Sequence, residues 1–166
     1  MGARAQVITY IRIKESQFNP FFIVHRQWAE GTSLLLEILD IMSFVFSERP
    51  NYFHKEFFRD EFKRKITRKF YLLPDYFLGT DESVKRFYDG MEWKKFDNDL
   101  GYAVLEINMN RDGSFTGQLD LKDCDFKPIT INQWRERFQY YDSRDDSEAF
   151  YSGFSSLMQW YEISVQ

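Results

Sequence analysis

Two alternating segments joined by a tight turn constrain the fold of this chain more than any other feature. Each segment places apolar residues at every second position and so presents an apolar face, as a strand does, with Ala103, Leu105, Ile107 and Met109 on one face of 102–109 and Phe115, Gly117, Leu119 and Leu121 on one face of 115–122. Asp112-Gly113 lies between them and suits a hairpin turn, because this dipeptide tolerates positive φ angles. The inward residues should pack beneath a later helix, with Leu105, Ile107, Leu119 and Leu121 contacting Phe150, Phe154 and Leu157.

The rest of the chain reads as short strands and amphipathic helices. β-Branched residues mark an antiparallel pair of early strands, and a phenylalanine-rich stripe marks a basic helix that should end before Pro74. Thr80 is a suitable N-cap for a short helix, and Asp145 or Ser147 should cap the last one. These patterns predict strands at 6–14, 21–28 and 128–131, helices at 31–48, 53–72, 81–89 and 145–161, and either structure at 133–141.

Length and composition favour one domain, residues 1–166, with one hydrophobic core. A domain of about 150 residues buries about 70% of its unfolded surface. Most of the 18 Phe, 10 Tyr and 4 Trp residues should lie in that core, because burying them removes large apolar areas from water. Hairpins with helices between and after them predict an α+β fold, in which helices cover mainly one face of an antiparallel sheet.

Several locations and site types are disfavoured by the sequence. Cys124 is the single cysteine, and the first residues lack the apolar run of a signal peptide, so we expect a reducing, cytoplasmic location. The longest apolar-rich stretch, 34–46, is shorter than the roughly 20 residues that span a bilayer, so no membrane association is expected. His25 and His54 do not lie at metal-ligand spacing, and no phosphate-binding glycine loop is present. We therefore expect neither a metal nor a cofactor.

Charge is distributed unevenly along the chain. Residues 1–72 carry 12 basic and 8 acidic side chains, whereas residues 73–166 carry 10 and 18, so the halves have net charges of +4 and −8. Acidic groups mixed with large rings suit an interface with a basic protein, because charge speeds encounter and buried rings slow dissociation. Solubilising loops are the alternative interpretation. The residues expected to bind the partner are Asp120, Asp123, Asp125, Trp134, Tyr140, Tyr141, Asp142, Asp145, Asp146 and Glu148.

The basic segment 53–72 supports a second interpretation, binding to nucleic acid. Its cations would contact phosphates while nearby rings stack on bases, although a solvated helix face explains the same charges. The expected phosphate-binding residues are Lys55, Arg59, Lys63, Arg64 and Arg68. A third interpretation is a small hydrolase, since the chain has many carboxylates and a pair of them can act as general acid and base.

A strand, an Asp-Gly turn and a second strand form the stretch YAVLEINMNRDGSFTGQLDLKD, and a closing amphipathic helix follows it. In this layout, over roughly residues 100–162, the chain resembles the immunity proteins of bacterial polymorphic and contact-dependent toxin systems. Such proteins neutralise a cognate toxin, often a nuclease, by occluding its active site. The resemblance implies a non-enzymatic protein that binds a toxin, and the basic helix departs from that pattern.

Overall fold

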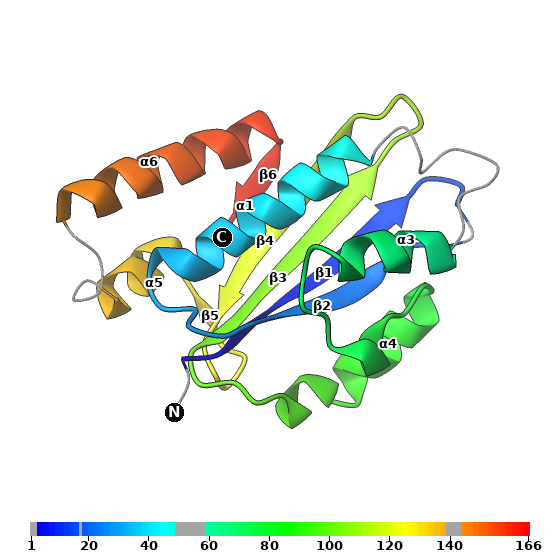
Figure 1. Ribbon diagram of the computed structural model, residues 1–166, viewed down its shortest axis with the longest axis horizontal. Coiled ribbons are helices and arrows are strands. Elements are labelled where there is room, and N and C mark those ends of the chain that lie inside the picture. Colours follow the sequence, from blue (N-terminus) through cyan, green and yellow to red (C-terminus); the bar gives the residue numbers. More distant parts are fainter. Residues whose placement is uncertain (1–2, 17, 49–58, 139–143) are drawn as a thin grey trace.

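The computed structural model describes residues 3–16, 18–48, 59–138 and 144–166, and for residues 59, 74 and 144–146 the backbone alone. Within this part of the chain six strands form one sheet, in the order β2-β1-β3-β4-β5, with β6 also pairing with β4 (Figure 1). The strands are β1 (Ala5–Ile13), β2 (Phe21–Arg26), β3 (Gly101–Met109), β4 (Phe115–Lys122), β5 (Pro128–Ile129) and β6 (Ile163–Val165). The first five confirm the predicted strands, and β6 is an addition.

The sequence had predicted an antiparallel sheet, but the sheet is mixed, with both antiparallel and parallel pairs of strands. β1 is antiparallel to β2, and β3 to β4, which confirms both expected pairs. β1 and β3, however, are parallel along their whole length, and β6 is parallel to β4. Parallel neighbours need a long connection between strands. The stretch 27–100 between β2 and β3 supplies it, so β3 enters the sheet beside β1 in the same direction.

Helices cover both faces of this sheet, and most of them lie on one face. They are α1 (Thr32–Ser47), α3 (Arg59–Thr67), α4 (Asp81–Asp89), α5 (Ile131–Arg137) and α6 (Arg144–Trp160), with 3₁₀ turns at Pro74–Tyr76 and Glu92–Lys95. Figure 1 shows α1 and α6 side by side along one face, with α4 on the opposite side of the sheet. The predicted α+β class, with helices mainly on one face, is confirmed.

Alternate strand residues enter one of two hydrophobic cores. The larger core lies beneath α1, α3, α5 and α6 and includes Leu105, Leu119 and Phe154. The smaller core lies on the other face, beneath α4, and includes Tyr10 and Phe87. Because both cores draw on β1, almost every residue of this strand is buried, as is typical of strands covered on both faces. Within the described ranges, no helix is both long and apolar enough to cross a bilayer.

The helix predicted at 53–72 ends earlier than residue 72. α3 ends at Thr67, and residues 53–58 lie outside the described part of the chain. After α3 the backbone follows the outer edge of β2, where Leu72 forms an isolated bridge with Val24. Pairing with the edge strand satisfies backbone groups that a longer helix would have used within itself. Pro74 then starts a 3₁₀ turn.

The structure decides between the alternatives for the stretch 133–141 and tests those for the N-cap of the last helix. The ambiguous stretch 133–141 contributes to α5, whose N-terminus is closed by a capping box at Thr130. α6 begins at Arg144, so Asp145 and Ser147, the expected N-caps, lie inside the helix. The predicted cap of α6 was therefore wrong by at least two residues.

The predicted packing of α6 over the hairpin holds for Phe154 and fails for Leu157. Phe154 is 1% exposed in the larger core, and Phe150 is partly buried against the same core. Leu157 is 43% exposed, which places it on the surface. Tyr151 and Met158 are buried instead, because α6 is rotated relative to the predicted stripe.

Candidate functional site

The acidic residues expected to bind a partner do not form one cluster. Asp120 lies on β4, on the side of the sheet that carries the smaller core. Asp123 and Asp125 follow in the turn after β4, where the Asp123 carboxylate accepts the N–H groups of Asp125 and Lys127, both at 2.9 Å. Glu148 is an exposed residue of α6, over the other face. The sheet therefore separates the two expected groups.

Trp134 is fully buried and is not part of a surface. Its indole N–H donates to the carbonyl oxygen of Gly31 at 2.8 Å, inside the larger core. A side chain without exposed area cannot contact a partner, so the expectation for Trp134 was wrong. Outside the described part of the chain lie the remaining expected residues, which are Tyr140, Tyr141 and Asp142, and the side chains of Asp145 and Asp146.

Two of the expected phosphate-binding cations make contacts within the fold. The Lys63 ammonium lies 5.4 Å from the centre of the Phe77 ring, and Arg64 pairs with Glu61 at 3.8 Å. Arg68, just beyond α3, is exposed. Outside the described part lie the other two, Lys55 and the side chain of Arg59. The described cations of this helix thus partly serve the structure around it.

Two carboxylates lie close together on the open part of the face that carries the smaller core. Glu106 on β3 pairs in register with Gln118 on β4, and Asp120 lies two residues further along β4 on the same face. The Gln118 amide donates to Asp120 at 2.9 Å, and Arg12 pairs with Glu106 at 3.3 Å. We name Glu106, Gln118 and Asp120 the acidic sheet face. Glu106 was not predicted, although its polar position in the alternating segment 102–109 was the available signal.

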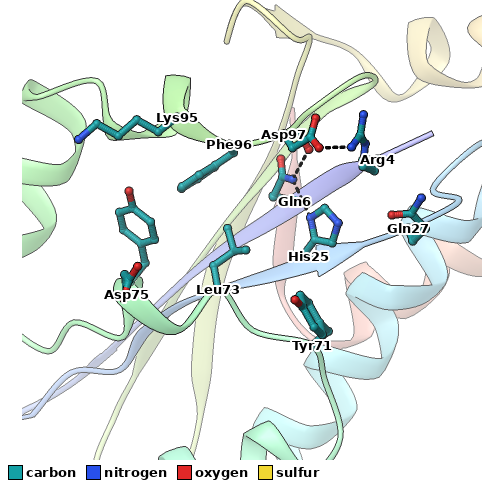
Figure 2. A pocket seen from close by; sticks show the side chains of 11 residues that line it. Arg4, Gln6, His25, Gln27, Tyr71, Leu73, Asp75, Lys95, Phe96 and Asp97 are labelled. Carbon is teal, nitrogen blue, oxygen red and sulfur yellow. Dashed lines mark hydrogen bonds and ion pairs between the residues drawn. The ribbon is translucent and has the colours of Figure 1, made fainter. Parts of the chain in front are cut away.

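A hollow of about 500 Å³ lies at the end of the sheet where β1 begins and β2 ends. We name it the β1–β2 hollow. Figure 2 shows that Tyr71, Leu73 and Phe96 surround it, together with polar side chains. A second hollow of about 670 Å³ adjoins it, since His25, Gln27 and Tyr71 line both. The sequence offered no signal for either hollow, because the first is lined by four separate segments and the second by three.

Gln6 forms the floor of the β1–β2 hollow and is fully buried. Its amide nitrogen donates to the Asp97 carbonyl oxygen at 3.0 Å and lies 2.9 Å from Nδ1 of His25 (Figure 2). Its amide oxygen accepts from Asn98. Because this network makes the Gln6 nitrogen the donor, Nδ1 of His25 is the acceptor and the ring proton lies on Nε2. A buried amide bonded on both ends gives the hollow a rigid floor.

Ion pairs surround the mouth of this hollow. Arg4 binds both Asp97 and Asp99, the latter at 2.9 Å. The hydrogen bond from Arg4 lowers the pKa of Asp99, and the same bond raises the pKa of Arg4. Lys95 pairs with Glu92 at 2.8 Å, and this hydrogen bond lowers the pKa of Glu92. Both cations that line the hollow are therefore held by carboxylates.

Glu37 and Asp40, which line the second hollow, are the pair of carboxylates that best fits the hydrolase interpretation. Burial raises the pKa of Glu37, the neighbouring Arg26 opposes that rise, and Asp40 adds to it. Arg26 donates to Glu37 at 3.2 Å and limits this rise, but the net shift of the Glu37 pKa is upward, because burial is the largest contribution. Among the described residues that line the two hollows, none is Ser, Thr or Cys. The arrangement suits hydrogen bonding, ring stacking and charge pairing.

Neither a metal site among the described residues nor a similar known protein indicates a function for the chain. Among the described residues, no group of three or more His, Cys, Asp or Glu side chains is placed to hold a metal ion. No protein-family model matches the chain, and no curated protein or solved structure matches it.

Proposed function

We propose that this protein is a non-enzymatic binding module, an immunity protein that neutralises a bacterial toxin in the cytoplasm by covering a basic surface on it. The single observation behind this proposal is the acidic sheet face, formed by Glu106, Gln118 and Asp120. An open sheet surface with neighbouring carboxylates is complementary to a basic protein surface, because opposite potentials speed encounter and set orientation.

The two carboxylates of this face, Glu106 and Asp120, both act electrostatically on the Tyr88 hydroxyl. Burial raises the pKa of Tyr88, and the negative charges of Glu106 and Asp120 raise it further. Arg12 opposes them, but it already lies 3.3 Å from Glu106 and 3.8 Å from Asp81. Arg12 thus stands among three carboxylates, Glu106, Asp81 and Asp120, and with Lys122, the next residue of β4 on this face, the region still has one more negative than positive charge.

The β1–β2 hollow opens on the same face of the sheet. Gln6, Ile8, Tyr10 and Arg12 alternate along β1 and therefore share this face, and two of them, Ile8 and Tyr10, belong to the smaller core. Tyr71 at the hollow is 69% exposed, and Phe96 also lines the hollow. Large aromatic residues dominate the binding energy of many interfaces. This side of the molecule therefore offers charge for encounter and rings for affinity.

The proposal is tested by finding the partner and measuring neutralisation. The immobilised protein captures partners from a lysate of its native host at low salt, and each captured protein is then expressed alone and together with this protein. We expect one captured protein to stop growth when expressed alone and to be harmless when co-expressed. A lysate that yields no growth-inhibiting protein neutralised in this way contradicts the proposal.

A pair of charge variants locates the interface. Glu106→Gln with Asp120→Asn removes two charges from the acidic sheet face, and Asp145→Asn with Glu148→Gln removes two near the start of α6. If the acidic sheet face docks, the first variant associates several-fold more slowly and with weaker salt dependence, while the second keeps the original rate. The opposite result would move the interface to α6, and equal rates for all three proteins would exclude both surfaces.

A further inference from the structure

We infer that the β1–β2 hollow receives the guanidinium group of an arginine side chain that the basic partner inserts. The inference deepens the proposed function and rests on it, since it names the chemical group that the partner supplies. Three features of the hollow carry it, namely its aromatic walls, the balance of charge at its mouth and its rigid floor.

The walls of the hollow offer ring faces to a planar cation. Tyr71 is 69% exposed, and its ring stands edge-on to His25 with 5.8 Å between ring centres. Phe96 is held by Tyr76, with 5.0 Å between ring centres. Figure 2 shows Tyr71, Phe96 and Leu73 around the same space. A guanidinium group is planar and weakly hydrated, so it stacks on aromatic rings and is attracted by their negative faces.

The charge at the mouth favours a cation over an anion. Arg4 and Lys95, the two cations that line the hollow, are both held by carboxylates. Asp75 lines the hollow as a further exposed carboxylate, and the Asp97 side chain is 67% exposed despite its pairing with Arg4. The side chains that line the hollow balance these two cations against the carboxylates of Asp75 and Asp97, and Asp99 and Glu92, which pair with the same cations, add two negative charges beside it. A guanidinium is attracted there, and a phosphate group is repelled.

The floor keeps the hollow open before any ligand arrives. Gln6 links the ring of His25 to the backbone of Asp97 through bonds that involve no mobile surface group. A site whose groups are already fixed loses less conformational entropy when a ligand binds. The buried glutamine therefore has a role in binding that a purely apolar residue at this position would not fulfil.

The test is a titration of the whole protein with a small arginine probe, followed in its heteronuclear NMR spectrum. We expect N-acetyl-arginine amide to produce saturable shifts at His25, Tyr71 and Phe96, with a Kd on the order of millimolar. N-acetyl-citrulline amide has nearly the same shape without the charge, and it should produce none. Tyr71→Ala should weaken the arginine shifts several-fold, whereas Trp160→Ala, which removes another exposed ring on α6, should leave them unchanged.

Three results would overturn the inference. They are an absence of arginine shifts at the hollow, equal shifts with the citrulline probe, and shifts at the hollow with a phosphate probe, adenosine monophosphate, in place of arginine. Each of them leaves the proposed function open to its own test, because that test measures association with a toxin and not occupation of the hollow. Unchanged spectra of Tyr71→Ala away from the hollow confirm that this variant is folded.

Discussion

Trp134 joins two parts of the chain that are 103 residues apart. Its indole N–H donates to the carbonyl oxygen of Gly31 at 2.8 Å, so α5 is attached to the residue that precedes α1. Gly31 has a φ angle of 60°, which a glycine adopts without the steric cost of a side chain. Phe138 packs on Trp134 with 4.7 Å between ring centres. One tryptophan thus provides both apolar packing and a buried polar contact.

At the residue scale we predict that Trp134→Phe lowers the free energy of unfolding by about 1 to 3 kcal/mol, because it removes a buried hydrogen bond and leaves unfilled volume. The matched control is Trp160→Phe. Trp160 is 64% exposed, so the same change there should cost less than about 0.5 kcal/mol. Denaturant unfolding of both variants measures the difference, and equal costs would show that the indole of Trp134 contributes nothing beyond its phenyl-sized part.

A small rotation of α6 about its axis changes which of its side chains are buried. Its buried positions are Ser147, Tyr151, Phe154 and Met158, at spacings of four, three and four residues. The predicted stripe shared only Phe154 with this set. Both stripes satisfy helical periodicity, because apolar residues occupy more than one side of α6. Contact with α1 and β6 selects the stripe that is buried.

At the element scale we predict that Phe154→Ala costs about 3 to 5 kcal/mol, the usual range for emptying a buried phenylalanine site. Leu157→Ala, one turn further along α6, should cost less than about 1 kcal/mol because Leu157 is 43% exposed. Chemical denaturation measured by circular dichroism gives both values. A larger cost for Leu157→Ala than for Phe154→Ala would mean that α6 is rotated toward the stripe predicted from the sequence.

The sheet divides the whole molecule into two cores of different chemistry. The larger core is built mostly from aliphatic side chains and phenylalanine, whereas the smaller core contains Tyr10 and Tyr102, with Tyr88 packed against it. Burial raises the pKa of all three phenols, in the case of Tyr102 to about 12. The Tyr102 hydroxyl also donates to the carbonyl oxygen of Trp93 at 2.8 Å. The smaller core therefore couples folding to alkaline pH.

At the scale of the whole molecule we predict a loss of stability in alkali. An unfolded tyrosine ionises near pH 10.0, while the folded pKa of Tyr102 is about 12, so the native state holds this proton more tightly. The resulting stability is complete below about pH 10 and is lost as the pH rises through about 12. The free energy of unfolding, measured by denaturant titration between about pH 9 and about pH 11.5, should stay level up to about pH 10 and fall above it.

Two variants separate this effect from general alkaline damage. Tyr102→Phe should make the decline with pH shallower, because it removes one of the phenols whose proton the fold retains. Tyr71→Phe changes a 69% exposed tyrosine and should keep the original slope. Identical slopes for all three proteins would mean that Tyr102 does not carry the dependence.

Local features of this protein were determined by the sequence alone. The Asp112-Gly113 turn, with Gly113 at a φ angle of 84°, connects β3 and β4 as predicted. Thr80 caps α4 through a capping box, and α4 covers the predicted residues 81–89. Turn chemistry, capping and periodicity depend on residues within a few positions of each other, so a short window contains the whole interaction.

The tertiary structure alone decided which segments meet and which side chains are covered. The alternation in β1 and β3 is compatible with either direction of pairing, and the energy that makes them parallel comes from residues about 96 positions apart. The same holds for Trp134, whose aromatic character suits a core and an interface equally well, and for Gln6, which contacts Asp97 and Asn98 only after the sheet has formed. Burial and binding surfaces result from these distant contacts, because a side chain is buried only when another segment covers it.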